Sequence, residues 1–510
     1  MHQCLLIQEI LISIFRHVIG PLNVELALDD FVGLWDRKSL AALARTCCAF
    51  RDPALDLLWA RLHTFNPLIQ CLPGVWELHS PPNSGPIIKL RRPILAADWR
   101  IFHKYARRVR ALGGGYVNKG SSRIDTSVMH ALCSYPSLST PILPNLRYLY
   151  WDDSRKELFP FLRFFLTPSL VRLELSLDSW TDSKLTTLSS LGALCPALKE
   201  YYCPNPRAIA MPAISESILQ WEKLEVLETG IPSSEALRHL SLSAYLKHLI
   251  VHLPPDLSAA VPRASFGASL PSVTLLASTL SHCTRFVEQI KLSPQTVRIV
   301  LYHPSSEHLA QAFLTSLASR LSADTTQRIT IEHYNCDISE IDKPENVWGW
   351  ATMIPFTSFG NLRTLNIKSF CSSGLDDDDL DRLASSWPLL ETFILGTEHN
   401  WYTPAKLTHR GLLALLSRCP RLRSLGLVFD ATTIGPPSLD KPGCGAMNVN
   451  ITTLDVGNSA VGEALFVAAF LSAILPNVKT ILRLDSFHED MLPRERTWGE
   501  VQSLLLLFVA

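Results

Sequence analysis

Hydrophobic residues recur along most of the chain in the pattern Leu-x-x-Leu-x-Leu. Clear copies are Leu170/Leu173/Leu175, Leu246/Leu249/Val251, Leu362/Leu365/Ile367, Leu390/Phe393/Leu395, Leu422/Leu425/Leu427 and Ile451/Leu454/Val456. Between residues 146 and 478 the first positions are 22 to 36 residues apart, as in chains built from short structural repeats. The last two positions of each copy alternate, so we expect them on one face of a short strand, with the residue between them pointing outward.

The segments between these copies predict helices that end at a proline. After the helical period of Gly411–Leu416, Cys419-Pro420 ends the helix before the next strand, because proline cannot continue a helix. Cys195-Pro196, Trp387-Pro388 and Leu475-Pro476 occupy the same place. Looser copies occur at Leu146/Leu149/Trp151, Leu198/Tyr201/Cys203, Leu224/Leu227/Thr229, Leu270/Val273/Leu275, Val297/Val300/Tyr302, Thr326/Ile329/Ile331 and Val478/Ile481. We therefore predict an α/β fold in which residues 142–510 form a curved parallel sheet with outer helices; the alternative is an ordinary leucine-rich α/β domain.

These repeats and the N-terminal segment resemble F-box proteins with C-terminal leucine-rich repeats. The repeat Leu412–Leu427, with its Cys-Pro before the strand, is the best match to the irregular repeats of that family. In residues 1–72, the opening Leu6-Ile7-Gln8-Glu9-Ile10-Leu11 and the series Leu40, Leu43, Cys47, Phe50, Leu58-Trp59 follow the F-box spacing, in a form similar to that of mushroom-type fungi. Two departures are the missing proline at Ile7 or Gln8 and the insertion at residues 20–38.

The resemblance implies a receptor that catalyses nothing itself. F-box proteins dock onto the small acidic Skp-type adaptor of an SCF-type cullin ubiquitin ligase, and through it the cullin scaffold, while their repeats hold a protein substrate. The residues implied for adaptor binding are Leu6, Glu9, Ile10, Leu11, Phe15, Leu40, Leu43 and Trp59. Some of them must pack the F-box itself, and the sequence does not separate the two sets. The alternative is a non-catalytic scaffold or inhibitor whose N-terminal helices only cap the repeats.

The outward positions of the strands are the candidate substrate surface. We expect binding residues at Arg147, Tyr148, Tyr150, Arg172, Glu174, Tyr202, His248, Arg363, Lys368 and Arg423, with Glu200, His252, Asn366 and Thr453 as further candidates. The long gap between Thr326 and Leu362 contains an insertion at residues 336–361 with Trp348 and Trp350. This insertion is either a recognition element or a tucked flap.

Formal charge is distributed unevenly, although 47 basic side chains balance 47 acidic ones. Residues 80–140 carry ten basic and two acidic side chains, and within the predicted linker 73–141 a helix is expected at Asp98–Leu112. Its apolar positions should face the core, and its basic positions should mostly take the other face: Trp99, Phe102, Ala106, Val109 and Leu112 against Arg100, Lys104, Arg107, Arg108 and Arg110. The basic face is a solvated surface, a contact for an acidic adaptor or substrate, or a contact for nucleic acid or membrane.

Composition indicates a chain with a large core and no membrane segment. Apolar residues make up 47% of the chain, but the runs Ala464–Leu475 and Leu504–Ala510 are shorter than a bilayer span. The twelve cysteines are scattered without a Cys-x-x-Cys, which favours reduced, mostly buried thiols in the cytoplasm or nucleus. The terminal apolar run is expected either to tuck against the last repeat or to mark an incomplete chain.

The sequence lacks the common motifs for catalysis and for cofactor binding. The chain contains no Gly-x-Ser-x-Gly, no His-Glu-x-x-His and no kinase motif, and Gly115–Gly120 precedes Ser121 where a phosphate loop needs lysine. The cluster Asp376–Asp379 follows Gly374-Leu375 and precedes an apolar period, which favours acids at a helix start over metal ligands. We therefore expect neither enzymatic activity nor a cofactor or metal, and nucleic-acid binding is not the favoured role.

Overall fold

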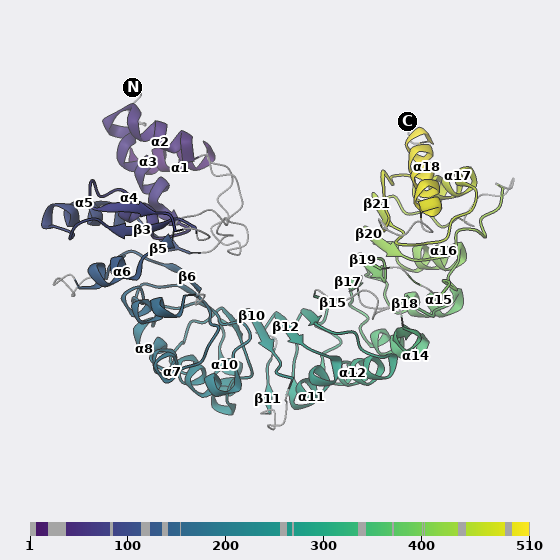
Figure 1. Ribbon diagram of the computed structural model, residues 1–510. Helices are drawn as coiled ribbons and strands as arrows, with labels where there is room; N and C mark the ends of the chain where they lie inside the picture. The colour runs from purple at the N-terminus through teal and green to yellow at the C-terminus, as the bar shows by residue number, and fades with distance from the viewer. Residues whose placement is uncertain are drawn as a thin grey trace. The chain divides into compact units, whose positions relative to one another are not determined.

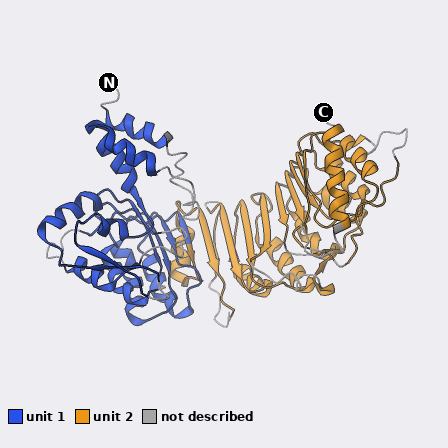
Figure 2. Ribbon diagram, turned by 45° about the horizontal axis from the view of Figure 1, so that its top comes forward, with its two compact units in different colours: residues 1–227 blue, residues 228–510 orange. Residues whose placement is uncertain are grey.

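The computed structural model divides the chain into two compact units, Met1–Leu227 and Glu228–Ala510 (Figure 2). It describes residues 7–18, 37–81, 85–113, 123–134, 141–152, 155–255, 263–267, 270–334, 343–369, 372–399, 401, 403–436, 445–484 and 492–508. Leu6, most of the insertion at 20–38 and the glycine cluster from Gly114 to Gly120 lie outside these residues.

Unit 1 begins with three helices and continues into a parallel sheet (Figure 1). Its helices are α1 (Gln8–Val18), α2 (Arg37–Thr46), α3 (Cys48–Ala60), α4 (Asn66–Gln70), α5 (Ala96–Ala106), α6 (Thr126–Cys133), α7 (Asp182–Ser189), α8 (Leu191–Leu194) and α9 (Met211–Ile218), with a 3-10 helix at Lys156–Phe164. Its parallel strands, in spatial order, are β1 (Arg61–Leu62), β4 (Ala111–Leu112), β6 (Tyr148–Asp152), β7 (Arg172–Ser176), β8 (Glu200–Tyr202) and β9 (Val226–Thr229), the last of which spans the unit boundary. A small separate sheet contains β2 (Trp76–His79), β3 (Ile87–Leu90) and β5 (Arg123–Ile124).

Unit 2 repeats a strand and a helix, with the helices on one face of the strands (Figure 1). Its parallel strands, in order, are β10 (His248–His252), β12 (Ser272–Ala277), β14 (Thr296–Leu301), β15 (Arg328–His333), β17 (Thr364–Ile367), β19 (Thr392–Leu395), β20 (Ser424–Leu427), β21 (Thr453–Asp455) and β22 (Thr480–Leu482). Its helices are α10 (Ser234–Leu242), α11 (Leu280–Gln289), α12 (Glu307–Arg320), α14 (Trp350–Met353), α15 (Asp377–Ser385), α16 (His409–Arg418), α17 (Ala464–Ile474) and α18 (Leu492–Phe508). Short strand pairs join β11 (Ala264–Ser265) to β13 (Ile290–Lys291), and β16 (Val347–Trp348) to β18 (Ser372–Ser373).

The parallel repeat confirms the predicted α/β class, and buried residues occupy the expected strand positions. Leu365 and Ile367 of β17 are fully buried, and their register partners Phe393 and Leu395 of β19 are buried as well. Cys419, at the Pro-marked helix end, is buried with its thiol near the carbonyls of the preceding repeat. Burial raises the pKa of this thiol to about 12, so it packs as a neutral group.

In one strand, β14, the residues that face inward differ from those that the sequence pattern predicted. The inward pair of β14 is Val297 and Ile299, because these residues are in register with the buried Val273 and Leu275 of β12. The predicted assignment Val297/Val300/Tyr302 was wrong in its last two positions. The run Val297–Leu301 is mostly apolar, so its pattern alone does not set which residues face the helices.

The predicted linker and helix boundaries also differ from the structure. The helix α5 ends at Ala106, and Ala111–Leu112 forms β4, which pairs with β1 on one side and β6 on the other. Gly113, at φ +87°, follows this strand where a Cβ would lie 2.3 Å from the carbonyl oxygen of Tyr150. The parallel sheet thus starts at β1, before residue 142, and α3 runs directly into it.

The last described helix covers the edge of the sheet. Trp498, Val501 and Leu505 of α18 are buried. Leu505 thus confirms that part of the apolar tail tucks against the last repeat, although Leu506, Leu507 and Phe508 are exposed. The amide of Gln502 accepts a hydrogen bond from the backbone N–H of Ile481 and donates one to the carbonyl of Lys479. This side chain therefore pairs with the edge strand β22 where a further strand would lie.

Acidic residues at helix starts connect neighbouring repeats. Asp376 caps α15 by accepting a hydrogen bond from the Asp379 amide, which confirms the helix-start interpretation of this cluster. Asp377 also accepts hydrogen bonds from the amides of Thr408 and Gly411 at the start of α16. Within the described residues, no helix is both long and apolar enough to cross a membrane.

Candidate functional site

The three N-terminal helices enclose an apolar groove of about 410 Å³. It is lined by Leu11, Ile14, Phe15, Ser39, Ala42, Leu43, Thr46 and Phe50. The rings of Phe15 on α1 and Phe50 on α3 meet edge to face, with their centroids 5.3 Å apart. Six of the eight lining side chains are apolar, a composition that suits an apolar side chain of a partner.

The residues that the F-box resemblance groups together differ in their burial around this groove. Leu11, Phe15 and Leu40 are almost fully buried and form the core of the three-helix head with Ala54 and Leu57. A partner can therefore touch Leu11 and Phe15 only at the floor of the groove.

Ile14 lines the groove and is 41% exposed. Ile7 is 47% exposed but is not one of the lining residues, whereas Ile10 and Leu43 are half-buried and Glu9 is exposed. Ile14 was missed as a site residue by sequence reasoning. Its position three residues after Leu11 is the signal that could have placed it on the same helix face.

Trp59 packs against the rest of unit 1. Its indole stacks on the ring of Tyr105 of α5, with 4.4 Å between centroids. The indole therefore packs the head onto the rest of unit 1 and is only half available to a partner.

Arg108 does not lie on the outer basic face on which the helical pattern predicted it. Its side chain is only 4% exposed and donates hydrogen bonds to the Asp52 carboxylate at 2.6 Å and to the Asp56 carboxylate of α3. The residue follows the end of α5, so the helical phase that predicted an outer position no longer applies. Arg100, Arg107 and Arg110 are exposed as expected. One of the five basic residues thus joins the head to the sheet.

Exposed charge on the described parts of the three N-terminal helices is mostly basic. Arg16, Lys38, Arg45 and Arg51 are exposed on the three helices, whereas Asp52 and Asp56 are both engaged by Arg108. Glu9 is the remaining acidic side chain of the described head. An acidic partner would therefore approach this surface favourably.

In unit 1, several predicted substrate residues form one cross-strand cluster. The Arg172 guanidinium lies 3.1 Å from the Glu200 carboxylate, 3.6 Å from that of Glu174 and 4.4 Å from the ring centre of Tyr202. Because Arg172 is buried among these partners, it chiefly stabilises the pairing of β7 with β8. Of the other candidates, Arg147 is exposed, and Tyr148 and Tyr150 are half-buried.

In unit 2, most of the predicted charged residues also pair with neighbouring strands. Arg363 pairs with Glu391, and the Lys368 ammonium lies 2.8 Å from the Glu398 carboxylate. His252 is buried against Glu228. His248 and Arg423 are exposed.

The described part of the insertion is tucked into the repeats. Trp348 is fully buried, and the Glu307 carboxylate of α12 accepts hydrogen bonds from the Gly349 amide and the Thr352 hydroxyl. These contacts favour a structural flap over a projecting recognition loop for residues 343–361.

No known protein family matches this chain, and no curated protein matches it.

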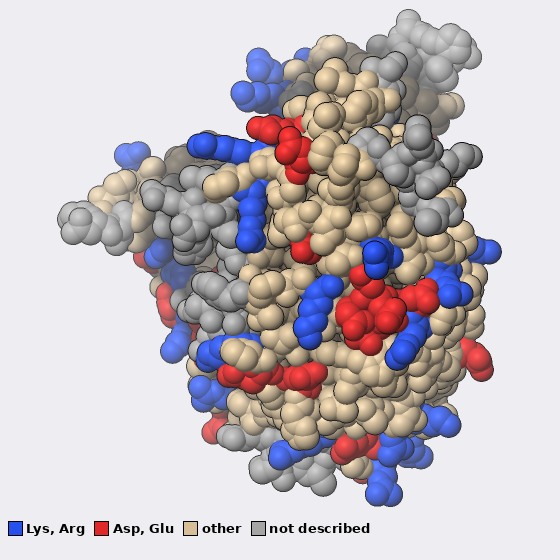
Figure 3. Space-filling model, turned by 90° about the vertical axis from the view of Figure 1, so that its right-hand side faces the viewer, with Lys and Arg blue, Asp and Glu red and all other residues tan. Residues whose placement is uncertain are grey.

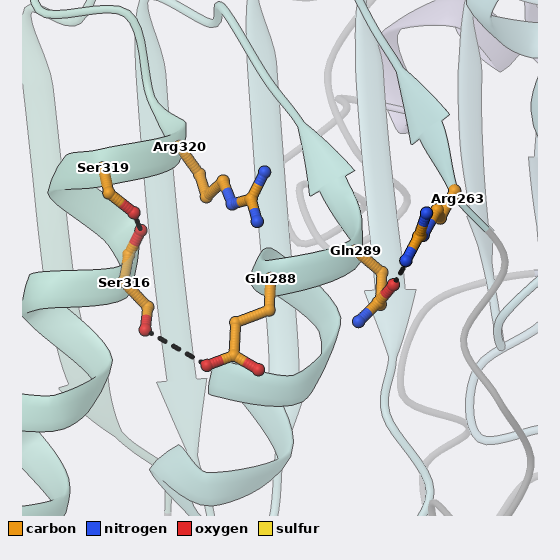
Figure 4. A pocket seen from close by; sticks show the side chains of 6 residues that line it. All are labelled: Arg263, Glu288, Gln289, Ser316, Ser319 and Arg320. Carbon is orange, nitrogen blue, oxygen red and sulfur yellow. Dashed lines mark hydrogen bonds between the residues drawn. The ribbon is translucent and has the colours of Figure 1, made fainter.

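A polar cleft of about 570 Å³ lies on the helix side of unit 2, between α11 and α12 (Figure 4). Arg263 and Arg320 approach it from opposite sides, while the Glu288 carboxylate accepts a hydrogen bond from Ser316 at 3.4 Å (Figure 4). The Arg263 guanidinium donates to the Gln289 side chain. Glu288 offsets one of the two positive charges, so the cleft is only weakly cationic.

Buried polar groups gather at the carboxyl ends of the strands in unit 2. Burial lowers the pKa of His333 and of His399 to about 4, so both imidazoles are neutral at physiological pH. Burial raises the pKa of Asp455, whose carboxylate accepts a hydrogen bond from Thr397 at 2.7 Å. Among the described residues, no three His, Cys, Asp or Glu side chains are arranged to hold a metal ion.

Surface charge alternates on the face drawn in Figure 3. Lys and Arg are interspersed with Asp and Glu among the described side chains there, apart from one compact acidic group. This distribution differs from the broad basic surface that contacts with a nucleic-acid backbone require.

Proposed function

We propose that the protein is a substrate receptor of an SCF-type cullin ubiquitin ligase, which binds a Skp-type adaptor through α1–α3 and a protein substrate through its repeats. The observation that carries this proposal is the apolar groove, because it is built from the residues that resemble an F-box. Its floor is packed into the core of the head, and the exposed side chain of Ile14 lines the groove.

Charge around the groove supports an acidic adaptor as its occupant. Arg16, Lys38, Arg45 and Arg51 are exposed on the described helices of the head, while two of its three described acidic side chains are occupied by Arg108. A partner that combines an apolar helix face with acidic flanks would bury Ile14 and approach a complementary potential.

The repeats support a binding role for the rest of the chain. A parallel array whose helices lie on one face leaves the other face of its strands available to a partner, as in repeat proteins generally (Figure 1). Holding a substrate on this face would raise its effective concentration near a ubiquitin carrier that the adaptor recruits.

A scaffold or inhibitor is the second candidate. It is favoured by the direct passage of α3 into β1 and by the buried Arg108 pairs, since these contacts are what a cap on the first strand requires. In that case the head would stabilise the sheet without binding an adaptor.

Replacement of Ile14 by arginine separates the two functions. Ile14 is 41% exposed, so Ile14→Arg should leave folding intact while placing a charge in the groove interface. We expect the full chain to co-purify with a fungal Skp-type adaptor and the variant to bind at least about tenfold more weakly, because a buried unpaired charge costs more than 1.4 kcal/mol.

The matched control is Leu219→Arg, which changes a leucine with 43% exposure after α9. It should bind the adaptor as the unmodified chain does. Absence of adaptor binding by the folded full chain, or equal binding by Ile14→Arg, would favour the cap interpretation.

A further inference from the structure

Cations on the outward side of β14 to β20 are mostly neutralised by the neighbouring repeat. Arg298 pairs with Glu332 across β14 and β15. Arg363 pairs with Glu391, and Lys368 pairs with Glu398, at the two ends of β17 and β19. Exposed pairs of this kind contribute little stability, but they leave no net charge for a partner.

Two arginines in the same stretch have no such partner. Arg328 opens β15 and Arg423 immediately precedes β20; both side chains are exposed. Neither makes an ion pair or a side-chain hydrogen bond with the part of the chain that the structure describes. On the outward side of β14 to β20, they are therefore described cations that remain free to bind an outside group.

The backbone fixes where these two arginines lie. Register pairs Arg328 with Thr364, Thr364 with Thr392, and Thr392 with Ser424. Arg423 precedes Ser424, and its amide donates to the Glu391 carbonyl, so it continues the same edge of the sheet. Both residues thus lie at the amino-terminal edge of the strands.

Small hydroxyl side chains occupy the strands between the two arginines. Thr364, Thr392 and Ser424 are half-buried and follow one another on adjacent strands. Each hydroxyl can donate and accept a hydrogen bond. They can therefore bind the backbone amides and carbonyls of a chain that crosses the strands.

We propose that this edge of unit 2 binds an extended acidic segment of a protein, with one carboxylate at Arg328 and another at Arg423. The strands β15 and β20 are three inter-strand steps apart, roughly 14 Å at ~4.8 Å per step. An extended chain advances ~3.3 Å per residue, so the two carboxylates are about four positions apart in the bound segment.

Discrete carboxylates fit this edge better than a continuous polyanion does. Glu332, Glu391 and Glu398 lie among the cations, and a nucleic-acid backbone crossing the sheet would meet them as well. A peptide with acidic residues only at the two arginines avoids that repulsion. The inference rests on the proposed function insofar as this segment would belong to the substrate.

The test uses the full chain and labelled peptides in fluorescence anisotropy at low salt. The probe contains two glutamates separated by three serines; comparison peptides carry two glutamines instead, or the two glutamates side by side. We expect the spaced glutamate peptide to bind most tightly. Arg328→Gln and Arg423→Gln should each weaken binding by about fivefold, and together by more than tenfold, because each removes an exposed charge pair.

Arg410→Gln is the matched control, since Arg410 is exposed on α16, the helix between β19 and β20. It removes the same charge and should leave peptide affinity unchanged. Equal binding by the double variant, or equal weakening by Arg410→Gln, overturns the proposal.

The adaptor interaction is measured on the same proteins. The double variant should retain adaptor binding, whereas Ile14→Arg should retain peptide binding. If the full chain binds the peptide but not the adaptor, the ligase function is refuted and the peptide site stands. If it binds the adaptor but the arginine substitutions do not weaken peptide binding, the peptide site is refuted and the ligase function stands.

Discussion

Neutralising Asp52 and Asp56 is expected to loosen the N-terminal helices from the sheet of unit 1. Arg108 is only 4% exposed, and its two counter-charges come from α3, more than fifty residues earlier in the chain. The double change Asp52→Asn and Asp56→Asn keeps side chains of nearly the same size and an oxygen acceptor at each position. It therefore removes the charges and little else.

The structure sets the expected magnitude. Removing one partner of a fully buried ion pair costs ~3–5 kcal/mol, because the remaining charge stays desolvated. Asp52 and Asp56 are 66% and 38% exposed, so water already screens part of the attraction, and we expect about 2–3 kcal/mol. Arg108→Met removes the buried cation itself and should cost no more than about 1 kcal/mol, since an apolar chain of similar length suits a buried site.

Amide hydrogen exchange of the full chain measures this effect locally, which avoids treating two units as one unfolding transition. The reporters are the amides of α3 and those of Arg110 and Gly113, which donate to the carbonyls of Ala60 and Leu62. A loss of 2 kcal/mol accelerates their exchange by about 30-fold.

The control variant and the result that would contradict this reasoning are measured on the same amides. Asp178→Asn removes an exposed carboxylate elsewhere in unit 1 and should leave them unchanged. Adding Arg108→Met to the double aspartate variant should restore most of the protection. Exchange within about twofold of the unmodified chain in the double variant would show that Arg108 does not depend on these carboxylates.

Two further predictions concern unit 2. Gln502→Ala should leave the Ile481 amide at the sheet edge without its partner and destabilise the α18 cap by about 1–2 kcal/mol, measured as faster exchange of that amide with unaltered exchange elsewhere in the unit. His333 and His399 should destabilise the protein in acid: their pKa is about 4 when folded and about 6.5 for an unperturbed imidazole in the unfolded chain, so only the unfolded chain takes up protons between these values, and stability falls as the pH drops from 6.5 to 4. Each would account for about 3 kcal/mol at most, and His399→Leu should flatten the pH dependence of urea unfolding; an unchanged slope contradicts the burial argument.

The periodic pattern was sufficient to predict the strands because every repeat carries its own copy of it. Leu365 and Ile367 are buried next to Phe393 and Leu395, as the alternation requires. It failed at Val300, where consecutive apolar residues satisfy either phase and the hydrogen-bonded neighbour strand sets the register.

The candidate site was only partly predictable, because the apolar residues of α1 both pack the head and line the groove. Leu11 and Phe15 pack the head, and exposed Ile14 beside them lies at the groove. The motif marks all such positions as apolar, but only the packing of α1 against α2 and α3 decides which of them face outward.

The sequence by itself determined the repeating strand and helix, the helices that end at a proline and the acids that begin α15. It also carries the resemblance to an F-box head. Local propensity and periodicity carry this information within a few dozen residues. Only the tertiary structure decided that Arg108 is buried against α3, that Arg363 is neutralised and that Arg328 and Arg423 have no ion-pair partner among the described residues. The physical reason is that a charge is paired or free according to which residues other strands and helices bring beside it, and those residues lie 28 to 56 positions away in the chain for the paired arginines.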